Sequence, residues 1–269
     1  MSRPVAVLRK PPVSAGVQGG LRLIERHVRA YRHSWLLLAS GALEPVLYLF
    51  SIGTGVGTLV GQVAGPDGEP VRYAAYIAPA LLATAAMNGT IADSTFNVFF
   101  RLKYTGLYSS ALATRMRPSD ITVGEIGWSV IRGVLYAAAF MGVCLAMGLT
   151  PSPWALLGLP VVMLMCFAIG AASMAATTYM KSILHFEFVP LVVLPMFLFS
   201  GTFYPIDVYP RFLQVLVECL PFYQGVALLR GLNLGAPDIS LWWHAGYLLA
   251  LGLVGAAIVR RRIGTLLLT

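Results

Sequence analysis

Residues 154–180 have the sequence WALLGLPVVMLMCFAIGAASMAATTYM, in which no Asp, Glu, Lys or Arg occurs. A transmembrane helix needs about 20 consecutive, predominantly apolar residues to cross roughly 30 Å of hydrocarbon. This stretch meets that requirement. The prolines at 151 and 153 end the preceding helical segment, because proline removes a backbone donor and restricts the residue before it. We therefore predict a membrane-spanning helix at 154–180.

The composition of the whole chain extends this prediction. Of its 269 residues, 58% are hydrophobic and 11% are charged, and the mean hydropathy is +0.76. An ordinary soluble domain has roughly 25% charged residues. The composition excludes a soluble globular enzyme, which needs a charged surface, and a disordered chain, which lacks apolar residues to bury. The fold class that remains is an all-α polytopic membrane protein.

Hydropathy predicts six spans within a membrane domain at 34–260. Their approximate ranges are 35–61, 73–100, 121–149, 154–180, 186–201 and 239–259. The segment 202–238 differs from them, because prolines at 205, 210 and 221 divide it into short apolar pieces. Each piece is too short to cross a bilayer, which favours re-entrant helices on the outer side. A hydrophobic soluble loop is the alternative.

The distribution of Lys and Arg predicts the orientation. Fifteen of them lie in 1–33, in 101–117, at 181 and in 260–262, whereas the alternate loops contain only Arg72, Arg211 and Arg230. Cytoplasmic loops of membrane proteins collect Lys and Arg. We therefore expect both termini in the cytoplasm, with short tails at 1–20 and 261–269. The same rule accounts for the formal net charge of +8 without binding to nucleic acid.

A basic amphipathic helix is predicted at 21–33, just before the first span. Its apolar stripe consists of Leu21, Ile24, Val28 and Tyr31, and its opposite face includes Arg22, Arg26 and Arg29. Such a helix lies in the membrane interface, with its arginines among anionic headgroups of the membrane lipids. A solvated helix without a functional role is the alternative.

Within the first two predicted spans lie two carboxylates, Glu44 and Asp93, and two side-chain amides, Asn88 and Asn97. Ionisable groups are costly in a bilayer and mark functional sites by default. They predict a polar strip that lines a translocation path, although hydrogen bonds that fix helix packing explain them equally well. The sequence identifies no cationic partner for Glu44 or Asp93.

Motifs for catalysis and for nucleotide binding do not occur. The chain contains no G-x-x-x-x-G-K-[ST] phosphate loop, no H-E-x-x-H, no G-x-S-x-G and no Cys-x-x-Cys. Its four histidines and three cysteines are scattered along the sequence. We therefore expect no catalytic residue, no metal site and no cofactor in this chain, and no binding of ATP by the chain alone.

Four stretches resemble the permeases of ABC type-2 transporters, particularly the subgroup with the nodulation lipo-oligosaccharide export permease. They are LEPVLYLFSIGTGVG at 43–57, IAPALLATAAMNGTIADSTF at 77–96, TGLYSSALATRMRPSDITVGEIGW at 105–128, and LPMFLFSGTFYPIDVYPRFLQVLVECLPFYQGVALLRGLNLG at 194–235. The last is the most specific, with a P-x-x-x-x-S-G-x-x-x-P pattern followed by Leu-Pro and Leu-Leu-Arg-Gly. The resemblance covers about residues 20–260.

The resemblance implies a six-helix permease that forms a dimer, with a second copy or with a related permease, and works with two separate ATP-binding subunits. ATP and magnesium belong to those partners. The region 101–117 is then the coupling region that contacts the ATPase, and its candidate residues are Arg101, Lys103, Tyr104, Leu107, Tyr108 and Leu112. The outer segment becomes a gate, with candidate residues Phe203, Tyr204, Phe212, Glu218 and Phe222.

The function expected on these grounds is outward, ATP-driven transport across a bacterial inner membrane. The cargo is an amphipathic, lipid-linked or glycolipid molecule, or a drug. An ion-coupled secondary transporter that uses Asp93 and Glu44 is the alternative from another class. An intramembrane enzyme is disfavoured, because no nucleophile and base are grouped in the sequence.

Overall fold

The computed structural model describes residues 15–31, 41–65, 68–235 and 241–267. Helices dominate these residues, and the two short strands form one antiparallel ribbon in which Val63 pairs with Val71. Among the described residues, five helices are long and apolar enough to cross a membrane. The prediction of an all-α polytopic membrane protein is confirmed.

The described elements follow one another along the chain in a single order. They are α1 (Ala15–Tyr31), α3 (Leu43–Tyr48), η1 (Leu49–Val56), α4 (Gly57–Val60), β1 (Gln62–Ala64), β2 (Pro70–Arg72), α5 (Tyr73–Ala92), η2 (Asp93–Asn97), α6 (Val98–Lys103), α7 (Leu107–Leu112), α8 (Pro118–Ala146), η3 (Pro153–Leu157), α9 (Gly158–Thr177), η4 (Ile183–Glu187), α10 (Phe188–Phe199), η5 (Ile206–Val208), α11 (Arg211–Glu218), α12 (Pro221–Leu234) and α13 (Leu241–Leu267). The elements η1 and η2 are π-helical, whereas η3, η4 and η5 are 3₁₀ turns.

The long helices correspond to the predicted spans with three differences. The described part of the first span is Leu43–Val60, and the predicted start at 35 lies outside the described residues. The predicted fifth span is a shorter apolar helix, Ile183–Phe199. The predicted sixth span ends at 259, whereas the helix α13 continues through three arginines to Leu267. Arginine is a good helix former, and its long stem lies along apolar surface while its charge reaches water.

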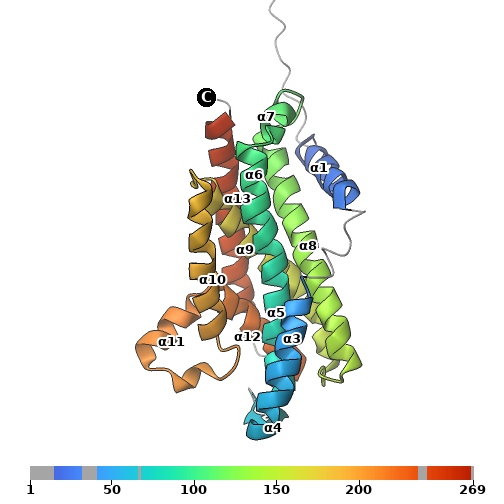
Figure 1. Cartoon of the computed structure of the whole chain (residues 1–269), viewed down its shortest axis with the longest axis vertical. Coiled ribbons are helices and arrows are strands. Elements are labelled where there is room, and N and C mark those ends of the chain that lie inside the picture. Colours follow the sequence, from blue (N-terminus) through green and yellow to red (C-terminus); the bar gives the residue numbers. More distant parts are fainter. Residues whose placement is uncertain (1–14, 32–40, 66–67, 236–240, 268–269) are drawn as a thin grey trace, which may run out of the picture.

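The helices form one elongated bundle around α5 (Figure 1). Almost the whole of α5 is buried, and it packs against α8, α9 and α12. Figure 1 places α1, α7 and the last turn of α13 at one end, and α4 and α11 at the other. We call these the α7 end and the α11 end.

Glycines allow the helices to approach closely, as is common in membrane bundles. A Cβ added at Gly133 of α8 would lie 2.2 Å from the Thr90 hydroxyl of α5. A Cβ at Gly255 of α13 would lie 2.7 Å from the backbone of Ala171 in α9. Both contacts require glycine, and they fix α8 and α13 against the central helices.

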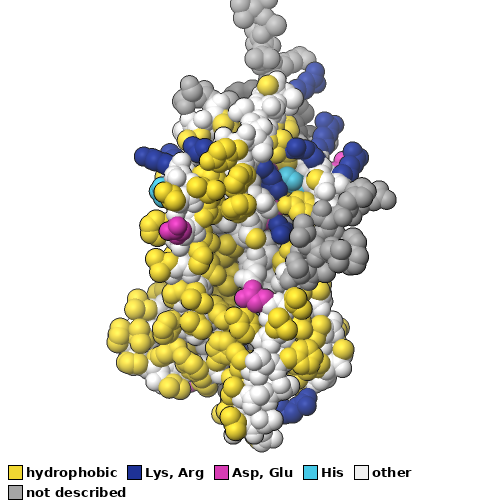
Figure 2. Space-filling model, viewed as in Figure 1, with side chains coloured by type: hydrophobic (Ala, Val, Ile, Leu, Met, Phe, Trp, Pro, Cys, Tyr) yellow, Lys and Arg dark blue, Asp and Glu magenta, His cyan; other side chains and the backbone are white. Residues whose placement is uncertain are grey.

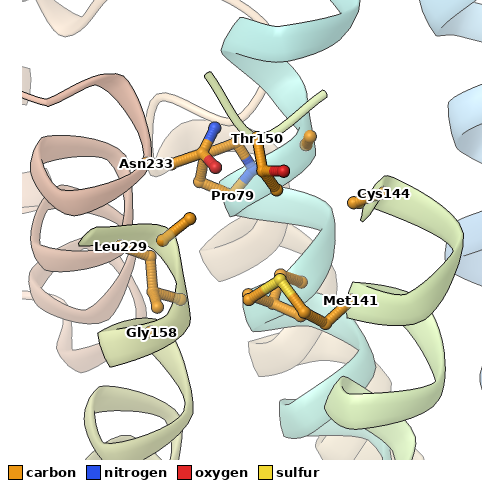
Figure 3. Close-up of a pocket in the computed structure, with 10 residues that line it drawn as sticks. Pro79, Met141, Cys144, Thr150, Gly158, Leu229 and Asn233 are labelled. Atoms are coloured by element: carbon orange, nitrogen blue, oxygen red, sulfur yellow. The ribbon is translucent and has the colours of Figure 1, made fainter. Parts of the chain in front are cut away.

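A proline inside α5 is compensated by a side chain from α12. Pro79 has no backbone N–H, so the carbonyl of Ala75 lacks its usual helical donor. The Asn233 amide donates to the carbonyl oxygens of Ala75 at 3.5 Å and Leu149 at 3.2 Å. Asn233 and Pro79 line a cavity of about 10 Å³, room for one water at most (Figure 3). Asn233 thereby joins α12 to α5 near the α11 end.

The surface agrees with a membrane-spanning bundle. On the face drawn in Figure 2, hydrophobic side chains cover the molecule toward the α11 end, and most Lys and Arg side chains gather toward the α7 end. The exposed apolar residues include Leu191 of α10 and Leu253 of α13. Such a surface is stable only against hydrocarbon.

Candidate functional site

A cluster of ionisable side chains is buried where four elements meet near the α7 end. His27 comes from α1, Asp93 from η2, Arg101 from α6, and Glu125 and Arg132 from α8. We call these five residues the charge cluster. Four of its members belong to spans, and the fifth, His27, belongs to the helix that precedes the first span.

Each charge in the cluster has an opposite partner. Arg101 donates to Glu125, and its other terminal nitrogen lies 3.5 Å from Asp93 Oδ1. Arg132 Nη1 lies 3.3 Å from the same Asp93 oxygen. His27 Nε2 is 3.3 Å from Glu125 Oε1, which joins α1 to α8. The cluster therefore connects all four elements through two carboxylates.

Burial makes these pairs interdependent. The side chains of Asp93 and Glu125 are 0% exposed, and those of the two arginines are 12% and 13% exposed. Charges removed from water are tolerated when paired, whereas loss of one partner leaves an uncompensated charge and costs about 3–5 kcal/mol. The sequence identified no cationic partner for Asp93, and in the structure Arg101 and Arg132 both contact it.

The helix α1 packs its His27 side against α8. Leu23 and His27 are buried, and the His27 ring stacks on Trp128 with centroids 5.6 Å apart. The helix begins at Ala15 rather than at the predicted 21, and residues 32 and 33 lie outside the described part. The predicted polar face is exposed, with Arg22, Arg26 and Arg29 pointing away from the protein. Of the predicted apolar stripe, Leu21 and Val28 are exposed, as expected for a helix at a membrane surface.

The predicted coupling residues divide into an outward and an inward set. Lys103 and Tyr104 are exposed, and Gly106, with a φ of +62°, reverses the chain before α7. Arg101 and Tyr108 point inward, toward the charge cluster. Burial, and next the nearby Glu125 carboxylate, raise the pKa of Tyr108 well above its usual value, so its phenol stays protonated. The exposed face of α7 is formed by Ser109 and Ser110, which the sequence prediction did not include.

The predicted polar strip is divided into two pairs. Asn97 donates to Asp93 at 2.6 Å, as their spacing of four residues predicts, and this pair belongs to the charge cluster. Asn88 donates to Glu44 at 3.0 Å, and Glu44 is exposed on the face that α3 shares with α5. Of these two pairs, Glu44–Asn88 has an exposed carboxylate, whereas the carboxylate of Asp93 is buried.

The predicted gate residues lie at the α11 end. The helices α11 and α12 meet at an angle of 87°, which is too sharp for one straight span. Phe203 and Phe222 pack against Phe197 of α10, with centroids 5.4 and 6.3 Å away. Tyr204 and Phe212 are exposed, and Glu218 is half-buried.

Side-chain bonds to backbone carbonyls hold this segment in place. Arg230 of α12 donates to the Gly201 carbonyl at 2.6 Å and lies 4.1 Å from the Tyr76 ring centroid. Tyr73 donates to the Phe203 carbonyl at 3.2 Å. Arg230 was missed as a site residue, although it belongs to the Leu-Leu-Arg-Gly motif and is the one basic residue of α12.

Comparison with known proteins identifies the family. The model of the ABC-2 type transporter family matches residues 21–234. The chain is 31% identical to nodulation protein J of Rhizobium leguminosarum bv. trifolii, over 88% of this chain and 91% of that protein. Its identity with nodulation protein J of Rhizobium leguminosarum bv. viciae is also 31%, over 93% and 96%. The probable doxorubicin resistance ABC transporter permease protein DrrC of Mycobacterium tuberculosis is 26% identical over 91% and 87%. The chain therefore belongs to the ABC-2 type transporter family, as the membrane-spanning permease subunit of an ABC exporter.

Proposed function

We propose that two copies of this chain and two separate ATP-binding subunits form an exporter in a bacterial inner membrane. Both termini and the α7 end face the cytoplasm. The single observation that carries the proposal is the charge cluster, which connects α1, α6 and α8 directly beneath the exposed surface of α7. The excess of Lys and Arg in the loops at this end supports the orientation.

The chain's own role in this proposal is mechanical. The ATP-binding subunit contacts the exposed residues Lys103, Tyr104, Ser109 and Ser110. Its closure on ATP displaces α7 and α1, and the buried ion pairs of Arg101 transmit that displacement to η2 and α8. A buried cluster of ion pairs suits this role, because its partners move together or lose several kcal/mol. Arg101 is thus a positioning residue within the permease and not a contact of the ATPase.

The cargo we propose is an amphipathic or lipid-linked molecule, or a drug. Similarity to a permease named for doxorubicin resistance supports the drug. Glu44 and Asn88 form a polar spot on the otherwise apolar surface where α3 meets α5. That combination suits a molecule with both polar and apolar parts.

Reconstitution into vesicles tests the proposal. The permease is purified together with a separate ABC ATP-binding subunit, and export of a fluorescent amphiphile is followed with and without ATP. We expect export to require ATP and to continue after a protonophore removes the proton gradient. Export that needs the gradient and not ATP would instead support an ion-coupled transporter that uses Asp93 and Glu44.

A substitution pair tests the contact with the ATPase. Lys103→Glu combined with Tyr104→Ala changes only exposed side chains, so the permease should fold and insert normally. We expect the ATP-binding subunit to co-purify at least about tenfold less, since lost interface contacts of roughly 1–2 kcal/mol weaken binding by that order. Arg211→Glu, an exposed charge reversal at the α11 end, is the matched control and should leave co-purification unchanged. Unchanged co-purification in the first variant as well would contradict the assignment.

A further inference from the structure

A groove separates α10 from the helices behind it. Ala172, Ser173 and Ala176 of α9 form its floor, and Val189 and Val192 of α10 form one wall. Its volume is about 310 Å³, which lies within the range of small-molecule sites. Figure 2 shows a hollow lined by hydrophobic side chains beside the position that α10 has in Figure 1. We call it the α9–α10 groove.

Aromatic contacts hold α10 to the bundle beyond both ends of the groove. Phe186 packs edge-on against Phe99 at 5.1 Å, and Phe197 packs against Phe222 at 6.3 Å. Between them the floor consists of residues too small to fill the space. The result is a slot rather than a flat face. It suits a thin, flexible chain better than a helix, which is about 10 Å across.

The hydroxyl groups that line the groove are already occupied by hydrogen bonds within the chain. The Thr95 hydroxyl donates to the Ile91 carbonyl at 2.6 Å, and the Ser173 hydroxyl donates to the Ile169 carbonyl at 2.6 Å. A ligand therefore gains chiefly by burying apolar surface here, which selects a hydrocarbon chain.

Two cations are associated with the chain around Met180, a residue that lines the groove. Met180 lines the groove, and the next residue, Lys181, is exposed and forms no ion pair among the described residues. On the other side of Met180, the Arg262 guanidinium lies 4.3 Å from the Tyr179 ring centroid. The Arg262 Nε is buried and has no hydrogen-bond partner within the described part of the chain. The nearest carboxylate to Lys181 along the chain is the exposed Glu187, six residues later. The two cations outnumber this one carboxylate.

We propose that the α9–α10 groove binds one acyl chain of an anionic membrane phospholipid, whose phosphate lies near Lys181 and Arg262. The apolar slot accounts for the chain, and the two cations account for the anionic headgroup. The lipid fills the space between α10 and α9 and holds α10 at a fixed distance. This site is independent of the identity of the exported cargo.

Photolabelling tests the site directly. The purified permease is placed in phosphatidylcholine bilayers with a small fraction of phosphatidylglycerol that carries a diazirine near the middle of one acyl chain. After illumination, labelled peptides are identified by mass spectrometry. We expect label to concentrate on the peptides of α9 and α10. Ala176→Phe, which fills the groove, should reduce that label several-fold, and Ala257→Phe on the exposed face of α13 is the matched control and should not.

Further variants keep the test valid if Ala176→Phe disturbs the folding of the permease. Val192→Phe fills the groove from the opposite wall and should have the same effect as Ala176→Phe. Lys181→Gln should lower the preference for phosphatidylglycerol over a phosphatidylcholine probe about fivefold, which corresponds to roughly 1 kcal/mol per basic residue near the membrane surface. Label spread over all lipid-facing helices and unchanged by either Phe variant would overturn the proposal. Cross-links from the groove to a second permease copy in place of lipid would overturn it too.

Discussion

The two ends of the permease are held together by different kinds of interaction. At the α7 end, Arg101 and Glu125 belong to a buried network in which every charge depends on another. At the α11 end, Arg230 and Tyr73 donate to single backbone carbonyls, and aromatic rings pack between α10 and α12. The α7 end is thus stabilised by charges that depend on one another. The α11 end is stabilised by contacts that form separately.

This difference corresponds to two mechanical roles. A buried charge network resists partial rearrangement, because any broken pair leaves a charge without its partner. A hydrogen bond from a charged group to a carbonyl contributes about 1.5–3 kcal/mol, less than the cost of breaking a buried ion pair, and its loss leaves no carboxylate without a partner. The α7 end is therefore suited to transmit a displacement, and the α11 end is suited to open and close. Substitutions at the two ends test this contrast.

The largest effect is expected from Glu125→Gln in the charge cluster. Glutamine keeps the size of the side chain but removes the charge that Arg101 and His27 contact. We expect the free energy of unfolding to fall by about 3–5 kcal/mol, as for a broken buried ion pair. Thermal unfolding in detergent measures this, and export by the reconstituted complex should be lost.

Glu69→Gln provides the control for that variant. Glu69 is an exposed carboxylate near the β-ribbon, and its replacement should change neither stability nor export. If Glu125→Gln were as stable and as active as Glu69→Gln, the cluster would not be a rigid connection between the elements.

A smaller effect is expected from Arg230→Gln at the α11 end. The variant removes a charged hydrogen bond to Gly201 and the contact with the Tyr76 ring. We expect a loss of stability of about 2 kcal/mol, since such a bond contributes roughly 1.5–3 kcal/mol. ATP turnover should persist while the amount of cargo exported per ATP falls, because α12 and the turn at 201 are no longer held together.

The same measurements on Arg211→Gln show whether loss of any arginine charge at the α11 end has this effect, or only the loss of Arg230. The Arg211 side chain is 77% exposed, and its contact with Glu218 is long, at 4.0 Å. Its loss should be close to neutral, as for most surface ion pairs. Equal losses of export and of ATP turnover in Arg230→Gln would show that this end transmits force as the other does, and the contrast would fail.

Hydropathy was sufficient to predict the fold, because a span needs only a long apolar sequence. It predicted the position of α9 closely, and it placed α5 with η2 and α6 within a few residues. It missed the extension of α13 to Leu267, because a helix that leaves the bilayer can continue through charged residues. The prolines of the segment 202–238 and its composition did not predict the 87° bend between α11 and α12.

The charge cluster could be predicted only in part. The pairing of Asp93 with Asn97 follows from a spacing of four residues on one helix. The pairing of Asp93 with Arg101 does not, because residues eight positions apart on a regular α-helix differ in direction by about 80°. The π-helical turn η2 lies between them and changes that direction, and sequence spacing does not reveal such a turn. The contacts of His27 and Arg132 join separate helices, so they depend on how the bundle packs.

The smallest effect on stability is expected between the two ends, from Glu44→Gln. Glu44 is exposed, and its one described contact is the hydrogen bond from Asn88, which the amide oxygen of glutamine can also accept. The free energy of unfolding should change by no more than about 0.5 kcal/mol, as for most surface substitutions.

Transport by Glu44→Gln then shows whether Glu44 and Asn88 line the translocation path or only fix the packing of α3 on α5. If Glu44 lines the translocation path, the cargo concentration for half-maximal export should shift, while ATP turnover without cargo stays unchanged. If the pair only fixes the packing of α3 on α5, both quantities should equal those of Glu69→Gln, because the hydrogen bond is retained. A variant that lost only gradient-driven transport would instead support ion coupling at Glu44. If only the cargo concentration for half-maximal export shifts, the Glu44–Asn88 surface differs from both ends of the permease. Its charge then affects the binding of cargo and not the stability of the protein.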